Sequence, residues 1–156
     1  MITAFAILVG GCLAAPNAHT PKQPSDSANV LAVVAGFHAA LVSGDSLAAL
    51  GFLDRDAIIL ESGATETRDE YRSHHLQADI EFARAVKSKQ SVLRVSLTGS
   101  AAWVSSTSIS RGQFKHRQIS SDGAELIVLR RAESGWKIAA IHWSSRAHRQ
   151  VPAGRK

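Results

Sequence analysis

The stretch FHAALVSGDSLAALGFLDRDAIILE, residues 37–61, contains the local signals that decide the fold. Its first part has apolar side chains at helical spacing up to Gly44, and glycine is the residue that most often follows a helix end. Asp45 can cap a second, short helix through residues 46–53. The segment 56–61 is short and rich in β-branched side chains, which is typical of a strand. The stretch therefore predicts helix, tight turn, helix and strand.

The flanking sequence extends this pattern in both directions. Upstream, Asp26 or Ser27 can cap the first helix. Downstream, residues 62–66 predict a loop, and Thr67 with Glu70 has the spacing of a capping box for a third helix. We expect that helix to run from about Arg68 to Ala85 as one element. The first helix has one broad apolar stripe, formed by Val30, Leu31, Val34, Phe37, Leu41 and Val42.

From Ser88 onward the apolar period changes from that of a helix to that of a strand. Glycine-bearing connections, TGS, SRG, SDG and ESG, predict hairpin turns between the strands. Helices followed by an antiparallel meander indicate the α+β class, with the helices packed on one face of the sheet. The predicted strands are 91–97, 101–109, 113–119, 125–131 and 136–144.

Composition places the chain among ordinary globular proteins. It has 156 residues, of which 45% are hydrophobic and 20% charged, so one domain with one core is expected. The net charge of +5 could favour an anionic partner. The basic residues are scattered, however, and no aromatic residues alternate with them as in a nucleic-acid groove. We therefore expect no nucleic-acid binding.

The N-terminal residues predict export. Residues 1–11 form a short apolar run of the kind found in signal peptides, and VGGC, residues 9–12, resembles a bacterial lipobox. On this hypothesis Cys12 is lipidated, and that lipid is the only membrane contact of a periplasmic or membrane-anchored protein. Residues 12–27 form a flexible tether and 147–156 a basic disordered tail. If the run is not a signal, the protein is cytoplasmic and Cys12 is inert.

The order of elements over residues 28–146 resembles the nuclear transport factor 2-like superfamily, specifically its SnoaL-like and ketosteroid-isomerase-like small proteins. The stretch 37–61 resembles that family's opening helix, turn, helix and strand, and GWKIAAIHWSS, residues 135–145, resembles its closing strand. The resemblance implies a cystatin-like cone in which three N-terminal helices cap a curved, mostly antiparallel sheet. It also implies an apolar pocket open at one end and a homodimer through the outer sheet face.

The isomerases of that superfamily use a carboxylate base with an oxyanion hole made by a tyrosine and a protonated aspartate. By resemblance, Glu61 falls at the position of the base. Phe37 falls at the position of the tyrosine and Ile127 at about that of the aspartate, and neither side chain can donate a hydrogen bond. Because one lost oxyanion donor slows such a reaction by orders of magnitude, steroid isomerisation is not expected.

The stretch EYRSHHLQAD, residues 70–79, places two histidines next to each other on the third predicted helix. Neighbours on a helix point about 100° apart, so His74 and His75 cannot both face the core. We expect His75 to face inward with Tyr71, above Asp79. On the closing strand, the resemblance implies that His142 points into the cone. The alternative for both His75 and His142 is a structural, hydrogen-bonded histidine.

These residues define the predicted site. We expect the domain to bind an unspecified small organic molecule without a cofactor. The alternatives are an acid–base enzyme and a dimeric interaction module. We interpret VSSTSIS, residues 104–110, as a face turned to water or to a second subunit. The predicted catalytic pair is Glu61 and His142, the predicted ligand contacts are Phe37, Tyr71, His75, Asp79 and Trp103, and a weaker metal alternative combines His75, His142 and Glu61.

Overall fold

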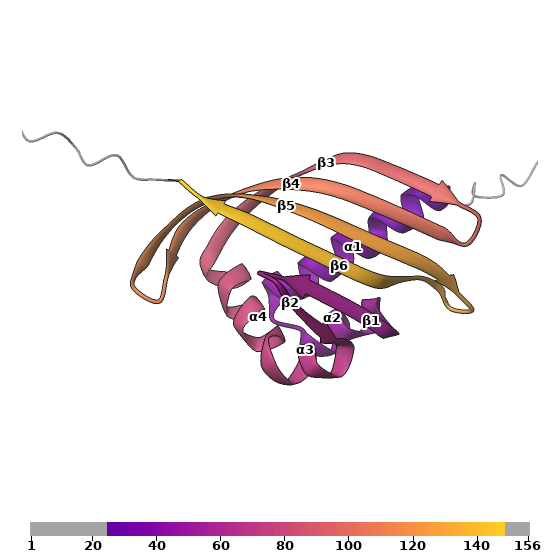
Figure 1. Cartoon of the computed structure of the whole chain (residues 1–156), viewed down its shortest axis with the longest axis horizontal. Helices are drawn as coiled ribbons and strands as arrows, with labels where there is room; N and C mark the ends of the chain where they lie inside the picture. The colour runs from indigo at the N-terminus through magenta and orange to yellow at the C-terminus, as the bar shows by residue number, and fades with distance from the viewer. Residues whose placement is uncertain (1–24, 149–156) are drawn as a thin grey trace, which may run out of the picture.

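The computed structural model describes residues 25–148, which form a sheet with helices on one of its faces (Figure 1). The sheet has six strands in the order β2-β1-β6-β5-β4-β3. All neighbouring strands are antiparallel except β1 and β6, which run parallel. The elements are α1 (Asp26–Ser43), α2 (Ser46–Phe52), β1 (Leu53–Glu61), β2 (Ala64–Thr67), α3 (Arg68–His74), α4 (Leu76–Ala85), β3 (Val86–Thr98), β4 (Ala101–Phe114), β5 (Arg117–Ala132) and β6 (Gly135–Ala147).

The long helix α1 forms where its apolar stripe predicts it. The Ser25 side chain accepts a hydrogen bond from the Ala28 backbone N–H, at 3.3 Å, and so caps the helix. The helix ends at Gly44, whose φ of 84° is in the left-handed region that glycine adopts without strain. Because α1 begins at Asp26, the last two residues of the predicted tether belong to the folded domain.

The third predicted helix consists of two helices. The capping box of Thr67 and Glu70 is confirmed at the start of α3. His75 then leaves ideal helical geometry, with φ of −112°, and separates α3 from α4. The residues before the capping box, predicted as loop, pair with β1 as the short strand β2.

The strands β4 and β5 form one long hairpin. The predicted turns at SRG and SDG are wrong, because both segments continue the pairing of the hairpin. Chain reversal occurs instead at Lys115 and His116, which both have positive φ, 45° and 64°. Gly112 lies within β4, where a Cβ would come 3.1 Å from the Cα of Val86. The glycine thus permits close approach of β3 rather than a turn.

The core lies between α1 and the sheet. Figure 1 shows α1 crossing behind β3 to β6, with α2, α3 and α4 packed beside β1 and β2. The far end of the β4–β5 hairpin curls toward α4, where Phe114 contacts Phe82 edge-on at 5.5 Å between ring centroids. Fully buried large side chains in this core are Val30, Phe37, Tyr71, Val104, Ile127, Leu129, Ile138 and Ile141.

Candidate functional site

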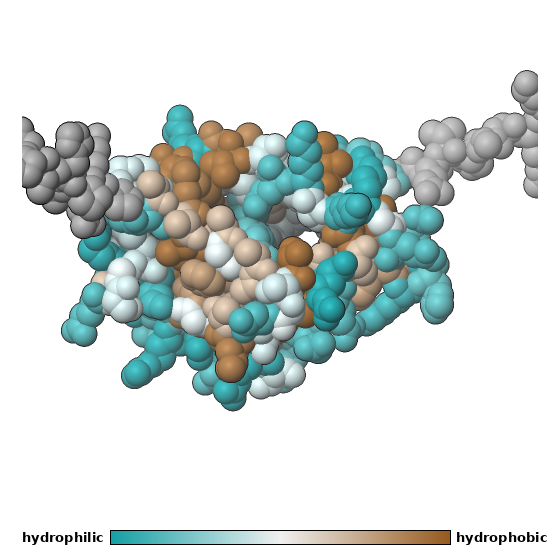
Figure 2. Space-filling model, turned by 180° about the vertical axis from the view of Figure 1, so that it is seen from behind, coloured by the Kyte–Doolittle hydropathy of each residue, from teal (hydrophilic) through white to brown (hydrophobic). Residues whose placement is uncertain are grey.

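A groove lies between the concave face of the sheet and the helices α1 and α4. Its volume is about 810 Å³, within the usual range for small-molecule sites. The space-filling view from behind shows a hollow on this side of the molecule, with polar and apolar residues around it (Figure 2). One wall is apolar and helical, formed by Leu41, Val42, Ala78, Phe82 and Ala83.

One end of the groove contains a buried carboxylate with several donors. Glu125, on β5, is 9% exposed. Its Oε1 accepts hydrogen bonds from the Gln90 amide at 2.7 Å and the Ser106 hydroxyl at 3.0 Å. Its Oε2 accepts from the Trp143 indole N–H at 2.6 Å. The Nε2 atom of His38 lies 3.2 Å from Oε1 and 3.1 Å from Oε2. The carboxylate is therefore fixed from four directions.

This arrangement keeps Glu125 ionised. Burial alone would raise its pKa, but the hydrogen bonds and charge of His38, together with Trp143 and Ser106, outweigh that effect and lower the pKa. Because an ionised carboxylate only accepts, we assign the proton of the contact to Nε2 of His38. His38 and Glu125 both line the groove, so a ligand can reach both side chains.

A second carboxylate, Asp79 on α4, behaves in the opposite way. It accepts a hydrogen bond from the buried Tyr71 hydroxyl, at 2.8 Å. Burial raises the Asp79 pKa to about 6, the Tyr71 hydrogen bond lowers it in part, and the charge of Glu61 raises it further. Burial and the adjacent Asp79 also raise the pKa of Tyr71. Asp79 is thus an acid that changes charge near neutral pH.

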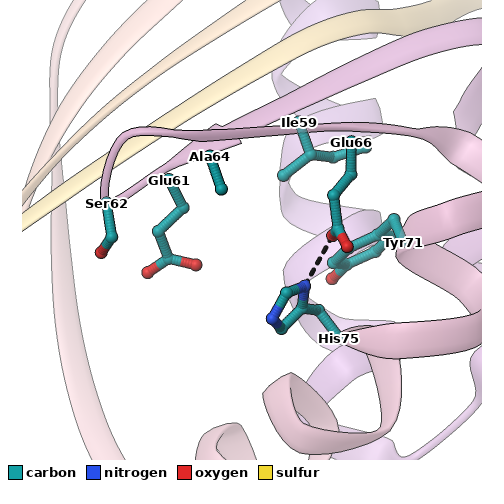
Figure 3. A pocket seen from close by; sticks show the side chains of 7 residues that line it. All are labelled: Ile59, Glu61, Ser62, Ala64, Glu66, Tyr71 and His75. Carbon is teal, nitrogen blue, oxygen red and sulfur yellow. Dashed lines mark hydrogen bonds and ion pairs between the residues drawn. The ribbon is translucent and has the colours of Figure 1, made fainter.

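A smaller pocket, of about 170 Å³, opens beside the β1–β2 turn (Figure 3). Glu61, Glu66, Tyr71 and His75 contribute to its walls. Nδ1 of His75 lies 2.7 Å from Oε2 of Glu66, and this contact raises the His75 pKa. Nδ1 of His74 lies 3.3 Å from the other oxygen of the same carboxylate.

The two adjacent histidines therefore do not divide into one inward and one outward residue. The side chains of His74 and His75 are 62% and 58% exposed, and both contact Glu66. The prediction that His75 lies on the inward stripe with Tyr71 is wrong, because the break between α3 and α4 turns it away from that stripe. His75 lies instead at the rim of the smaller pocket.

The prediction that His142 points into the cone is also wrong. The strand β6 contains an extra residue, Ala139, because Leu129 pairs with Ile138 and Val128 with Ala140. Such a bulge reverses the alternation of side chains beyond it. His142 is consequently exposed, and Trp143 takes the inward position. Glu61 pairs directly with Trp143 across β1 and β6, so the predicted Glu61–His142 pair is split between opposite sheet faces.

The remaining predicted residues lie in different places. Phe37 is fully buried and stacks on Trp143, with centroids 6.3 Å apart. Trp103 is 38% exposed and lies on the outer face, so its predicted contact with a ligand in the cone is wrong. Cys12 lies outside the described residues. Glu61 and Asp79 do line the same groove.

The metal alternative is not supported by this geometry. Within residues 25–148, no group of three or more His, Cys, Asp or Glu side chains is arranged to hold a metal ion. Its proposed ligand His142 is on the sheet face opposite Glu61, which makes the combination with His75 wrong.

Sequence reasoning missed the central residues of the groove. Glu125 has the same strand parity as the buried Ile127 and Leu129, which was a usable signal. Ser106 likewise has the parity of the buried Val104. The residues from other elements that complete this cluster could not be inferred, because only the packing of α1 and β3 brings His38 and Gln90 to Glu125.

Comparison with solved structures places this architecture in a family. A protein from Shewanella frigidimarina NCIMB 400, described as a "putative ketosteroid isomerase", is 32% identical, with a TM-score of 0.69 over 77% of this chain and 95% of that one. No protein-family model matches the sequence, and no curated protein matches it closely enough to be counted as a relative. The chain belongs to the nuclear transport factor 2-like superfamily, among its ketosteroid-isomerase-like proteins.

More distant structures have the same fold. A ketosteroid isomerase-like protein from Erwinia carotovora atroseptica SCRI1043 is 18% identical, with a TM-score of 0.65 over 79% of this chain and 98% of that one. A domain of unknown function with a cystatin-like fold, from Nostoc punctiforme PCC 73102, is 16% identical, with a TM-score of 0.64 over 79% of this chain and 78% of that one. The α+β, cystatin-like cone predicted from sequence is confirmed.

Proposed function

We propose that this domain binds a small organic molecule in the groove between α1, α4 and the concave face of the sheet. The observation that carries this proposal is the combination of a groove of about 810 Å³ with a buried, ionised Glu125 at its wall. Ligand sites typically join a mainly apolar enclosure with a few fixed polar groups. The description of the Shewanella protein as a "putative ketosteroid isomerase" supports the same use of the fold.

A thermal-unfolding screen against a metabolite panel tests the proposal. A ligand at a hundred times its dissociation constant stabilises the folded state by about 2.7 kcal/mol, which shifts the melting temperature measurably. Ala78→Phe places a large ring at the groove wall and is expected to abolish the shift. Ala39→Phe, at an exposed position on α1, is the matched control and should retain it. A shift that survives Ala78→Phe would locate binding elsewhere and overturn the proposal.

Acid–base catalysis is a second candidate, favoured by Asp79. Burial raises its pKa to about 6, and a group that titrates near the working pH is suited to proton transfer. Glu61 lines the same groove and could be a second proton carrier. The predicted partner His142 takes no part in this candidate, because it lies on the other sheet face.

Exchange of α-protons in D2O, followed by NMR on a set of cyclic ketones, tests this candidate without a known substrate. If Asp79 transfers protons, the wild-type protein accelerates exchange, and Asp79→Asn reduces it by at least about a hundredfold. Glu133→Gln, on the exposed β5–β6 turn, is the control and should exchange as the wild type does. Exchange at the buffer rate in the wild type would remove the catalytic candidate.

We also propose that the outer sheet face mediates a homodimer. The same face would carry the contacts of the alternative function, a dimeric interaction module. No described helix covers this face, and Ile58, Trp103 and Leu126 on it are 41%, 38% and 40% exposed. Exposed apolar patches on antiparallel sheets commonly mark contacts between proteins. The interpretation of residues 104–110 as one exposed face does not hold for the whole run, because Ser106 and Ser110 are buried on the inner side.

Export as a lipoprotein remains a proposal based on the sequence of residues 1–27. Its test is mass spectrometry of the protein from its native host. Cleavage before Cys12 and a lipid on its sulfur are expected, and an inhibitor of lipoprotein signal peptidase should leave the precursor. An unmodified N-terminus in the cytoplasmic fraction would overturn it.

A further inference from the structure

The floor of the groove is unusually rich in hydroxyl groups. Residues that face each other on β4, β5 and β6 form successive rows across the concave sheet face, and each row contains serine. These side chains come largely from the VSSTSIS run and its partner strand. In order toward the β4–β5 turn, the rows are Ser106–Glu125–Trp143, Ser108–Gly123–Ser145 and Ser110–Ser121.

Part of this hydroxyl surface has no protein partner. Ser106 donates to Glu125, and the Ser110 hydroxyl lies 2.7 Å from that of Ser88. In contrast, the hydroxyls of Ser108, Ser121 and Ser145 make no hydrogen bond to another residue of the segment 25–148. All three residues line the groove. Their hydrogen bonds are therefore left for water or for a ligand.

Gly123 leaves space at the middle of this floor. A Cβ at this position would lie 2.5 Å from Oγ of Ser108, so any side chain would displace that hydroxyl. The glycine thus leaves room for the Ser108 hydroxyl in the middle of the three rows. The opposite wall offers the hydrocarbon surfaces of Ala78, Phe82 and Ala83 on α4. The groove is accordingly polar along the sheet, while the helices contribute this apolar strip together with the polar side chains of His38, Asp79 and Arg84.

We propose that the ligand is an uncharged amphipathic polyol, which places several hydroxyls on the serine floor and its hydrocarbon edge against α1 and α4. This inference rests on the proposed function of the groove and narrows it to a ligand class. A serine hydroxyl both donates and accepts, so a row of serines complements a row of ligand hydroxyls. A wholly apolar ligand would instead displace water from the hydroxyls of Ser108, Ser121 and Ser145 without replacing the lost hydrogen bonds.

Titration calorimetry with n-hexyl-β-D-glucoside, below its micelle concentration, tests this chemistry. Glucose supplies the hydroxyls without the hydrocarbon, and 1-hexanol supplies the hydrocarbon with one hydroxyl. We expect hexyl glucoside to bind at least about tenfold tighter than either, because it uses both walls. A parallel titration compares forskolin, a rigid polycyclic polyol, with 1,9-dideoxyforskolin, which lacks two of its hydroxyls. Together with the hexyl glucoside titration, it shows whether the ligand hydroxyls belong to a polycyclic skeleton or to a sugar.

A triple variant, Ser108→Ala/Ser121→Ala/Ser145→Ala, tests the floor itself. It should weaken the better polyol by at least about tenfold and leave 1-hexanol unchanged, since each lost hydrogen bond contributes modestly. Ser96→Ala/Ser105→Ala is the matched control, because Ser96 pairs with Trp103 and Ser105 with Arg94, which places both serines on the outer sheet face. Thermal unfolding of each variant confirms that it is folded.

The outcomes separate this inference from the broader proposal. If 1-hexanol binds as tightly as hexyl glucoside, dideoxyforskolin binds as tightly as forskolin, or the triple variant binds polyols normally, the polyol inference is overturned while ligand binding in the groove stands. If only apolar members of the metabolite panel bind, and Ala78→Phe blocks their binding, the polyol inference is likewise overturned and ligand binding in the groove stands. If nothing binds in the groove, both proposals fall.

Discussion

Glu125 shows how a single buried charge organises the concave face. Its carboxylate is ionised, and donors from β3, β4, β6 and α1 surround it. Removing such a group leaves several donors buried without an acceptor, and each unsatisfied group is costly. A charge in this position therefore stabilises the fold only while the whole set of partners is present.

This argument predicts the effect of truncating Glu125. Glu125→Ala should lower the free energy of unfolding by about 2 to 4 kcal/mol, because the donors of Gln90, Ser106 and Trp143 lose their acceptor. Urea denaturation followed by tryptophan fluorescence measures the change. Glu133→Gln, at the exposed turn, should stay within about 0.5 kcal/mol of the wild type. A similarly small effect of Glu125→Ala would show that the network does not contribute to stability.

Asp79 gives a prediction with the opposite sign. Its pKa is raised from 3.8 to about 6, so burial favours the protonated form in the folded state. The stabilising contribution of that form is complete below about pH 4 and is lost as the pH rises through about 6. Asp79→Asn keeps an acceptor for the Tyr71 hydroxyl and removes the charge. The variant should therefore exceed the wild type in stability by about 1 to 3 kcal/mol at pH 8.

The pH dependence checks that explanation. Urea denaturation at a series of pH values should show the advantage of Asp79→Asn shrinking between pH 7 and pH 4 as wild-type Asp79 takes up its proton. An advantage that stays constant over this range would mean that the change acts through packing rather than through the charge of Asp79.

At the scale of elements, the β4–β5 hairpin has strain at its turn. Lys115 and His116 both have positive φ, which residues with a Cβ adopt at a cost. Two-residue hairpin turns with this geometry favour Asn followed by Gly. Lys115→Asn/His116→Gly should therefore stabilise the domain by about 1 kcal/mol.

Urea denaturation also measures this effect. The contrasting variant, Lys115→Val, places a β-branched residue at positive φ and should destabilise the domain. If both changes have the same sign, the turn in solution does not have the conformation described for Lys115 and His116.

The bulge in β6 is the element that decided which closing-strand residue enters the groove. Side chains alternate between the two sheet faces both before and after Ala139. Because Ala139 is an extra residue, however, the residues after it lie on the opposite faces from those that simple alternation predicts. Nothing local distinguishes a regular strand from a bulged one within IAAIHW, residues 138–143. The pairing of β6 with β5 and β1 places the bulge, and so it required the assembled sheet.

At the scale of the whole molecule, no described helix covers the outer sheet face. If it forms the proposed homodimer, Leu126→Lys should convert the protein to a monomer, because an unpaired charge would be buried at the contact. Light scattering after size-exclusion chromatography measures the mass. Leu47→Lys, on the 81% exposed Leu47 of α2, is the control and should remain dimeric.

The dimer prediction has a clear contrary result. A wild-type chain that elutes with the mass of one protomer, at concentrations well above those used in the binding assays, would assign the apolar outer face another role. Retention of the dimer in both lysine variants would place the interface away from Leu126.

The sequence by itself determined the α+β class and most of the order of elements. Caps, glycine positions and apolar periods act within a few residues, so α1, the start of α3 and the sheet character of the second half follow from local chemistry. The carboxylate Glu61 at the end of β1 was singled out by the family resemblance, and it does line the groove. Only the tertiary structure decided the groove, because His38, Gln90 and Glu125 are far apart in the chain and meet through packing. The same holds for the inward position of Trp143, since strand parity depends on how neighbouring strands pair.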